Sequence, residues 1–219
     1  MFIIYDLIFL IFILVYLPLY LIRGKFHRGF SSRLGILPAG LNLDRPIWIH
    51  AVSVGEAVSI KGLVAELRKA YPHKKLVIST VTATGNKIAR GLINHGDLLI
   101  YLPFDFSFIV RSVLKRINPC LFIIAETEIW PNLISRLYKQ KIPVVTVNGR
   151  ISNSSYAGYS AIKLFIRPIL RKVNIFLLQS DTDAERLQKL GVDKENIRVT
   201  GNVKFDLNLK TAAGLNVAD

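Results

Sequence analysis

The chain has 219 residues, and its 29 Lys and Arg against 15 Asp and Glu give a formal net charge of +14 at pH 7. The length predicts one to two domains with a sizeable core, while the apolar share of 51% and the mean hydropathy of +0.38 are high for a soluble chain. The charge indicates an anionic partner: nucleic acid, acidic phospholipid or a phosphorylated substrate. Because the chain has no zinc-finger or RNA-binding signature, we expect no nucleic acid partner. The single cysteine, Cys120, excludes an internal disulfide framework and fits a reducing compartment.

The N-terminal segment, residues 1–23, is predicted to be a membrane-anchor helix. Leu7 to Ile22 contains no charge or amide, and counted from Phe2 the apolar stretch is 21 residues long, enough for a bilayer core of ~30 Å. A cleaved signal peptide is disfavoured because a basic n-region and a cleavage site are missing, and a buried helix is the other alternative. Arg23 and Lys25 follow directly, so the rest of the chain is expected on the cytoplasmic side.

Three further segments follow the anchor. Residues 24–45 are rich in Gly, Ser and Pro and predict a juxtamembrane linker with at most a short helix. Residues 46–209 alternate apolar runs with helical spacing, and residues 210–219 lose this pattern, as expected for the start of a linker to a C-terminal domain that the chain lacks. The expected strands are Ile47 to Val52, Leu76 to Val81, Leu98 to Leu102, Leu121 to Ala125, Val144 to Val147, Phe176 to Gln179 and Ile197 to Thr200. The expected helices are Ala57 to Ala70, Gly85 to Gly91, Phe108 to Arg116, Pro131 to Lys139, Tyr156 to Arg171 and Asp183 to Leu190.

The apolar runs are continuous rather than alternating, which is typical of a parallel sheet covered on both faces. The fold class is therefore α/β, a Rossmann-like doubly wound parallel sheet preceded by the anchor helix. In such a sheet the polar residues that follow the strands converge on one edge, where ligands bind.

The first strand exit, His50-Ala-Val-Ser-Val-Gly-Glu56, delivers Ser53, Gly55 and Glu56 to this edge. Glu56 lies at the start of the next helix, where the helix dipole favours a negative charge. It is therefore either a functional carboxylate or a helix-capping residue, and this stretch alone leaves both open.

Later strand exits add further candidates. Glu126 directly follows Leu121-Phe-Ile-Ile-Ala, so it is expected to be partly buried, where a carboxylate is costly unless it is paired or used. Arg150 and Lys204 are possible partners, and Arg150 could also bind a phosphate or a sugar carboxylate. The remaining candidates at this edge are Glu128, Trp130 and Thr84.

Structural alternatives accompany several of these residues. Helix capping is the favoured interpretation for Thr84, Ser180 and Asp181, and Trp130 is more often a core residue than a ligand platform. Lys163, Arg167 and Arg171 recur at helical spacing among apolar residues, which predicts either a basic amphipathic helix that binds acidic lipid or an ordinary solvated helix face.

Absent motifs narrow the function. The chain has no Gly-x-Gly-x-x-Gly after the first strand and no Gly-x4-Gly-Lys-Ser/Thr, which argues against dinucleotide binding and against a P-loop. Its four histidines lack ligand spacing and there is no Asp-x-Asp, so neither a metal nor another cofactor is expected.

Six motifs in order closely resemble the 3-deoxy-D-manno-octulosonic acid (Kdo) transferases. They are His50-Ala-Val-Ser-Val-Gly-Glu56, Thr82-Ala-Thr-Gly85, Tyr101-Leu-Pro-Phe-Asp105, Glu126-Thr-Glu-Ile-Trp-Pro-Asn132, Asn148-Gly-Arg-Ile-Ser152 and Gly201-Asn-Val-Lys-Phe-Asp206. The resemblance implies the N-terminal, acceptor-binding half of a GT-B glycosyltransferase that transfers Kdo from CMP-Kdo to the lipid A precursor at the cytoplasmic face of the inner membrane.

The resemblance also implies roles for individual residues. Glu56 corresponds to the proton acceptor of an inverting transfer, and Glu126 and Lys204 assist at the transition state. Thr84, Trp130 and Arg150 are expected to line the acceptor site. Most of the CMP-Kdo site is expected in the missing C-terminal domain, so the alternative is a truncated, non-catalytic membrane-bound domain that binds lipid A precursor or acidic lipid.

Overall fold

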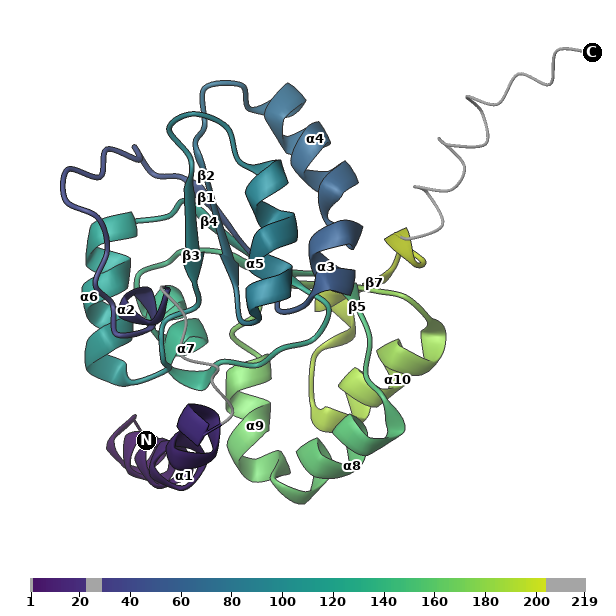
Figure 1. Cartoon of the computed structure of the whole chain (residues 1–219). Helices are drawn as coiled ribbons and strands as arrows, with labels where there is room; N and C mark the ends of the chain where they lie inside the picture. Colours follow the sequence, from purple (N-terminus) through teal and green to yellow (C-terminus); the bar gives the residue numbers. More distant parts are fainter. Residues whose placement is uncertain (1, 23–28, 204–219) are drawn as a thin grey trace, which may run out of the picture.

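Seven parallel strands form one sheet in the order β3-β2-β1-β4-β5-β6-β7 in the computed structural model of the chain, which describes residues 2–22 and 29–203 (Figure 1). The strands are β1 (Ile47–His50), β2 (Leu76–Thr80), β3 (Leu98–Tyr101), β4 (Leu121–Ala125), β5 (Val144–Gly149), β6 (Ile175–Leu178) and β7 (Ile197–Val199). All seven lie where the apolar runs predict them, so the predicted Rossmann-like doubly wound sheet is confirmed.

Helices connect the strands along the chain. They are α1 (Phe2–Ile22), α2 (Phe30–Arg33), α3 (Val54–Ser59), α4 (Lys61–Ala70), α5 (Ala83–Ala89), α6 (Ser107–Ile117), α7 (Pro131–Lys139), α8 (Asn153–Ala161), α9 (Lys163–Leu170) and α10 (Asp181–Leu190), with short 3-10 turns η1 (Arg90–Leu92) and η2 (Lys194–Asn196). The short α2 lies in the predicted linker.

Alternate residues of the strands from β1 to β5 face two separate cores, whereas the buried residues of β6 and β7 belong to the larger core. Trp48 and Phe122 point to the larger core, which α6, α7, α9 and α10 cover, and their rings meet edge to face at 5.0 Å. Ile49 and Ile123 point to the smaller core beneath α4 and α5. This arrangement follows from right-handed crossovers, because connections that run in opposite directions from the centre of the sheet place their helices on opposite faces.

Two predicted helices are each divided in the structure. Ile60 separates α3 from α4, and the Ser59 hydroxyl donates to the Glu56 carbonyl at 2.8 Å, a side-chain bond that bends helices. Ile162 separates α8 from α9 with a non-helical ψ of 27°. Pro168 lies inside α9, and a proline there removes the hydrogen bond one turn back. The prediction of one uninterrupted helix was wrong at both places.

The N-terminal segment is helical, as predicted, over Phe2–Ile22. Among the described residues, no helix combines the length and hydropathy needed to cross a membrane, so the predicted anchor lacks this support. The predicted linker to a C-terminal domain, residues 210–219, lies outside the described residues.

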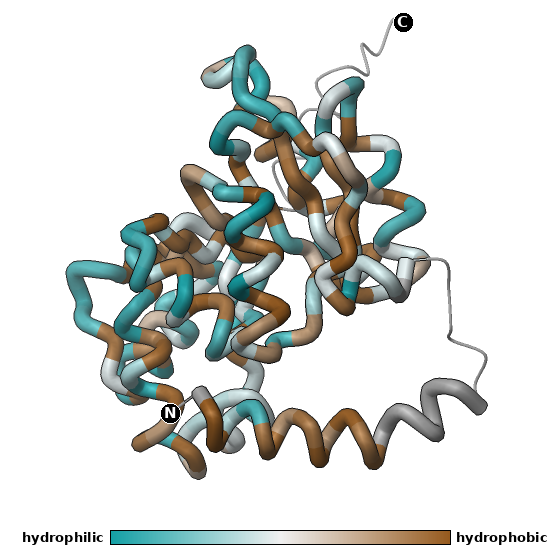
Figure 2. The backbone as a smooth tube through the Cα atoms, turned by 90° about the vertical axis from the view of Figure 1, so that its left-hand side faces the viewer, coloured by the Kyte–Doolittle hydropathy of each residue, from teal (hydrophilic) through white to brown (hydrophobic). Residues whose placement is uncertain are grey.

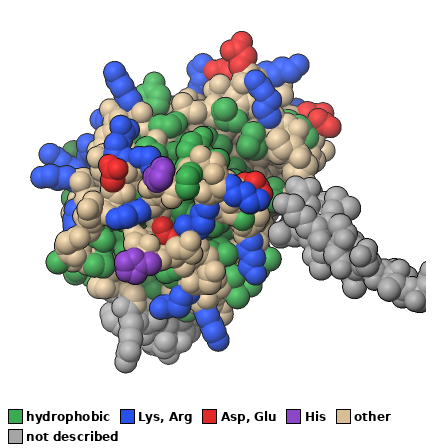
Figure 3. Space-filling model, turned by 90° about the horizontal axis from the view of Figure 1, so that it is seen from above, with side chains coloured by type: hydrophobic (Ala, Val, Ile, Leu, Met, Phe, Trp, Pro, Cys, Tyr) green, Lys and Arg blue, Asp and Glu red, His purple; other side chains and the backbone are tan. Residues whose placement is uncertain are grey.

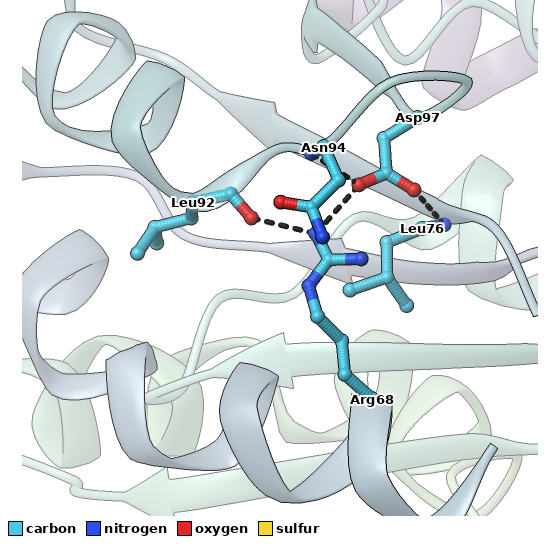
Figure 4. A network of polar contacts seen from close by, with 5 residues as sticks. All are labelled: Arg68, Leu76, Leu92, Asn94 and Asp97. Atoms are coloured by element: carbon cyan, nitrogen blue, oxygen red, sulfur yellow. Dashed lines mark hydrogen bonds and ion pairs between the residues drawn. The ribbon is translucent and has the colours of Figure 1, made fainter. Parts of the chain in front are cut away.

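A buried carboxylate connects α4, β2 and β3 at one edge of the sheet (Figure 4). Asp97 accepts hydrogen bonds from the Leu76 amide at 2.8 Å and the Asn94 amide at 2.7 Å. It also pairs with the Arg68 guanidinium at 2.5 Å, and the Asp97 side chain is only 3% exposed. This cluster joins the end of α4 to the beginnings of β2 and β3.

The excess positive charge is distributed over the surface. On the face seen from above in Figure 3, Lys and Arg side chains lie scattered among apolar and neutral ones, with few acidic side chains between them. This face shows no continuous basic stripe of the kind that would follow a nucleic acid backbone.

Candidate active site

The carboxyl ends of β1 and β4 lie side by side at the point where the strand order reverses. His50 of β1 pairs in register with Ile124 of β4, so the segments that leave these two strands begin next to each other. Such a switch point is where open α/β sheets bind ligands. It explains why Glu56 and Glu126, 70 positions apart in the sequence, reach the same place.

Glu56 is held by the loop that precedes it. Its two carboxylate oxygens accept from the Val52 amide at 2.7 Å and the Ser53 hydroxyl at 3.0 Å. Ser53 is the N-cap of α3, so this is a variant of the capping box. The side chain is 7% exposed. The helix-capping interpretation is therefore confirmed, and the same bonds fix the carboxylate at the sheet edge.

Three carboxylates influence one another at this edge. Burial raises the pKa of Glu56, against the hydrogen bonds from Val52 and Ser53, and the charge of Glu126 raises it further. Burial also raises the pKa of Glu128 to about 7, with added repulsion from Glu56 and Glu126. A carboxylate with the raised pKa of Glu128 can accept or hold a proton at physiological pH.

Glu126 is placed by an unusual backbone conformation. Its φ is +60°, a left-handed conformation that is uncommon for a residue other than glycine, and its amide donates to the Val147 carbonyl at 2.8 Å. The bond to the end of β5 keeps the chain in this turn. Backbone strain of this kind concentrates at functional sites.

Two aromatic residues border the carboxylates. Trp130 precedes α7, packs against the larger core, and meets the His50 ring edge to face at 6.2 Å. Its indole N–H is buried and has no partner in hydrogen-bond geometry among the residues that the structure describes, although it lies close enough to lower the pKa of Glu128. Tyr159 of α8 lies near the same carboxylate, since burial and the Glu128 charge together raise its pKa. Tyr159 follows no strand, so strand-exit patterns could not indicate it.

The loop after β2 supports the loop after β1. The amides of Val81 and Thr82 both donate to the Val52 carbonyl at 3.2 Å. A Cβ on Gly85 would lie 2.8 Å from the Thr82 hydroxyl oxygen and 3.1 Å from the Ser53 carbonyl carbon, so a larger residue would push the two loops apart. Thr82, not Thr84, caps α5, which corrects the predicted capping role. Thr84 and Gly55 are exposed at this edge.

Arg150 lies next to the segment that carries Glu126 and Glu128. Its amide donates to the Thr127 hydroxyl at 2.9 Å, and it lines a hollow of about 510 Å³ with Ser152 and Ser180. Ser180 caps α10 as predicted, accepting from the Asp183 amide at 3.3 Å, whereas Asp181 is the first residue of that helix. Two basic residues, Arg150 and Lys204, were predicted for the site from the sequence. Of these two, the structure describes only Arg150, because Lys204 lies outside the described residues.

Asp105 ends one of the six sequence motifs, but the sequence assigned no role to it. It is 1% exposed and accepts from the amides of Asn132 and Leu133 at 2.9 and 2.8 Å, which caps α7. Burial raises its pKa to about 7. Across residues 2–22 and 29–203, no three His, Cys, Asp or Glu side chains are arranged to hold a metal ion.

Comparisons with known proteins agree on one family. The family described as 3-Deoxy-D-manno-octulosonic-acid transferase (kdotransferase) matches residues 28–207. The 3-deoxy-D-manno-octulosonic acid transferase of Haemophilus influenzae is 36% identical over 74% of this chain and 38% of its own length. That of Chlamydophila psittaci is 32% identical over 84% and 43%. The chain therefore spans less than half the length of these two relatives.

Solved structures share the fold at low identity. The UDP-GlcNAc 2-epimerase from Neisseria meningitidis bound to UDP-GlcNAc matches 79% of this chain and 50% of its own, with a TM-score of 0.56 at 13% identity. A UDP-N-acetylglucosamine 2-epimerase described as putative, from Listeria monocytogenes, matches with a TM-score of 0.57 at 15% identity over 80% of this chain and 49% of its own. At such identities the likeness concerns the fold alone.

Proposed function

Because this chain belongs to the 3-deoxy-D-manno-octulosonic acid (Kdo) transferase family, we propose that it forms the acceptor-binding half of a glycosyltransferase in lipopolysaccharide synthesis. The donor is CMP-Kdo, the acceptor is the lipid A precursor, and the configuration at the anomeric carbon inverts. The observation that carries this proposal is the cluster of Glu56, Glu126 and Glu128 at the switch point of the sheet.

Glu56 acts as the general base in this scheme. The acceptor hydroxyl attacks the anomeric carbon of Kdo, the bond to the CMP phosphate breaks, and Glu56 takes the hydroxyl proton. Its raised pKa suits this step, because a base works best when its pKa lies close to the operating pH. The bonds from Val52 and Ser53 hold the carboxylate in one orientation, which lowers the cost of reaching the reactive geometry.

The neighbouring residues have supporting roles. Glu126 stabilises positive charge that develops on the sugar ring, and Lys204 stabilises the departing phosphate. Ser53, Gly55, Thr84, Glu128, Trp130 and Arg150 line the acceptor site. A second domain holds most of the CMP-Kdo site, in keeping with the greater length of the relatives. No cofactor takes part.

We further propose that the domain works at the cytoplasmic face of the inner membrane, attached through α1 and in contact with acidic phospholipid. Nine large apolar side chains of α1 between Ile3 and Val15 are exposed. The same observation favours the alternative function, a non-catalytic domain that binds lipid A precursor or acidic lipid.

The test measures CMP release and Kdo transfer to a lipid A precursor. The chain is assayed alone and mixed with the C-terminal part of the Haemophilus influenzae relative beyond the matched region. Transfer by the mixture supports the glycosyltransferase, whereas precursor binding without transfer in either sample supports the alternative.

The Glu56→Gln variant tests the base assignment. Glutamine keeps an oxygen that can accept from Val52, so the fold and the melting temperature should stay unchanged while transfer falls by roughly 10²- to 10⁴-fold. Glu185→Gln, on the exposed surface of α10, is the matched control and should be fully active. An active Glu56→Gln protein would rule out Glu56 as the base.

A further inference from the structure

The first turns of α1 are fastened to the domain by polar contacts. Asp6 accepts from the Ser107 amide at 3.0 Å, from the Ser107 hydroxyl at 2.5 Å and from the Asn132 side-chain amide at 2.6 Å. Ser107 and Asn132 lie at the starts of α6 and α7, where a negative charge is favourable. The N-cap residue of α6, Phe106, makes no side-chain cap bond of its own, so α1 supplies the cap for a helix about a hundred residues away.

Aromatic contacts hold the same side of α1. The Tyr5 ring stacks on Phe165 of α9 with a centroid distance of 6.1 Å. One turn later the Phe9 ring meets Phe106 edge to face at 5.1 Å. Aromatic pairs in such arrangements stabilise a contact beyond the area they bury. The first half of α1 is therefore packed along the domain surface rather than projecting from it, as Figure 2 shows along the lower edge of the molecule.

The opposite side of α1 is apolar and exposed. Ile4, Ile8, Ile11 and Val15 are each 60–66% exposed, and their spacing of four, three and four residues places them on one helix face. This surface continues onto the neighbouring helices. Phe108 of α6 follows Ser107 and is 67% exposed, and Leu164 of α9 precedes Phe165 and is 97% exposed. We call the exposed faces of α1, Phe108 and Leu164 the apolar patch.

Basic residues accompany the apolar patch. Lys163 and Arg167 of α9 are exposed beside Leu164 and one turn beyond it, and Arg111 of α6 is exposed one turn beyond Phe108. An apolar surface bordered by cations matches the interface of an acidic bilayer, where acyl chains lie beneath anionic headgroups.

We propose that α1 lies in the plane of an acidic membrane surface and attaches the domain from one side, rather than crossing the bilayer. A crossing helix would carry its first turns through a hydrocarbon core of ~30 Å, yet Tyr5, Asp6 and Phe9 contact the domain itself. The proposal refines the membrane attachment in the proposed function but needs neither Kdo transfer nor a second domain.

The first experiment measures how deeply the exposed face of α1 inserts into a bilayer. In a Cys120→Ala background, single cysteines replace Ile4, Ile8, Ile11 and Val15 and carry an environment-sensitive fluorophore. The protein is bound to vesicles of phosphatidylethanolamine and phosphatidylglycerol, and lipids brominated at different depths quench the signal. We expect all four positions at one shallow depth, ~5–10 Å into the interface. A profile that is deepest at Ile8 and Ile11 and shallow at Ile4 and Val15, or no binding, would overturn the proposal.

The second experiment measures topology in the native membrane. The full chain with an N-terminal epitope is produced in cells, and inverted inner-membrane vesicles are treated with a protease. An in-plane α1 leaves the epitope on the same side as the domain, so it should be digested without detergent. An epitope protected until detergent is added would mean that α1 crosses.

Charge variants test the choice of an acidic surface. Lys163→Gln and Arg111→Gln should each lower partitioning into acidic vesicles by ~5-fold and leave weak binding to neutral vesicles unchanged. Lys87→Gln on α5, on the other face of the sheet, is the control and should bind like the parent protein. Equal losses on neutral vesicles would refute the role of headgroup charge. Kdo transfer enters none of these measurements, so failure here and failure of the proposed function are separable.

Discussion

His50 is a fully buried histidine that the structure keeps neutral. Its Nδ1 lies 3.0 Å from the Ser79 carbonyl, so this nitrogen carries the proton and Nε2 is unprotonated. Nε2 has no hydrogen-bond partner in the described part of the chain. Burial lowers the pKa of His50 to about 4, because a buried imidazolium would lose its hydration.

We expect acid to destabilise the domain partly through this residue. Between pH 6.5 and 4 the unfolded chain binds a proton at His50 that the folded chain does not, so stability falls as pH falls through this window. The His50→Asn variant keeps a donor for Ser79 but cannot titrate, and should avoid roughly 2–3 kcal/mol of this loss. Urea unfolding at pH 6.5 and 4.5 measures the difference, with the exposed His73→Asn as control. Equal losses in all three proteins would contradict the prediction.

Glu128 gives the stability of the domain the opposite dependence on pH. Its pKa is raised to about 7, mainly by burial and then by Glu56 and Glu126, so between pH 4.5 and 7 the folded chain holds a proton that the unfolded chain releases. Stability therefore falls as pH rises through this window. The Glu128→Gln variant should gain about 1–2 kcal/mol over the parent at pH 8 and little at pH 4.5, after allowance for partial solvent screening.

The test compares the free energies of unfolding of the parent, Glu128→Gln and the exposed control Glu185→Gln at pH 4.5 and pH 8. A gain of the same size at both pH values would show that the effect is packing rather than charge.

Among the contacts between elements, the hydrogen bonds and ion pair of Asp97 with Arg68, Leu76 and Asn94 hold the end of α4 against the sheet. The Asp97→Ala variant removes the acceptor of the Leu76 and Asn94 amides and the ion-pair partner of Arg68, which keeps its hydrogen bond to the Leu92 carbonyl. We expect a loss of about 2–3 kcal/mol, the cost of leaving buried polar groups unsatisfied.

Glu185→Ala is the comparison, because its pair with Lys189 is exposed and 3.9 Å long and should contribute less than about 0.5 kcal/mol. Thermal and urea unfolding measure both changes. Equal effects of the two substitutions would mean that burial does not strengthen the Asp97 cluster.

Sequence patterns predicted the strands well because their signal is local. Short segments rich in apolar residues and bounded by turn residues are sufficient to mark a buried strand, and all seven were found. The breaks at Ile60 and Ile162 were missed because they depend on backbone geometry and on one hydroxyl bond of Ser59. Thr84 was assigned the wrong role because Thr82, two residues earlier, supplies the cap.

At the scale of the whole molecule, pattern alone does not order the strands. The neighbouring positions of β1 and β4 bring Glu56 and Glu126 together. The sequence therefore indicated which residues follow the strands, and only the order of the strands shows which of these residues lie close to each other. Tyr159 and the docking of α1 could not be predicted, since both depend on contacts between distant segments. The catalytic roles of Glu56, Glu126 and Lys204 stay predictions.

The crossover pattern also leaves part of one sheet face open. Among the described residues no helix covers the side of β6 and β7 that faces away from the larger core, and Ile175 there is 41% exposed. A hollow of about 350 Å³, lined by residues that include Leu63, Leu177 and Val203, lies between this face and α4. The sheet is thus less completely covered than the continuous apolar runs predicted.

The distance along the chain between Asp6 and its partners sets an order of events during synthesis. Ser107 follows Asp6 by 101 residues and Asn132 follows it by 126. At ~5–20 residues per second, the ribosome takes about 6–25 s to make the second partner after Asp6. Throughout that interval α1 has no docking site, so its apolar side chains are available to a bilayer or a chaperone before the domain exists. Contact of α1 with the membrane can therefore precede folding, and the domain is then completed on a helix already in place.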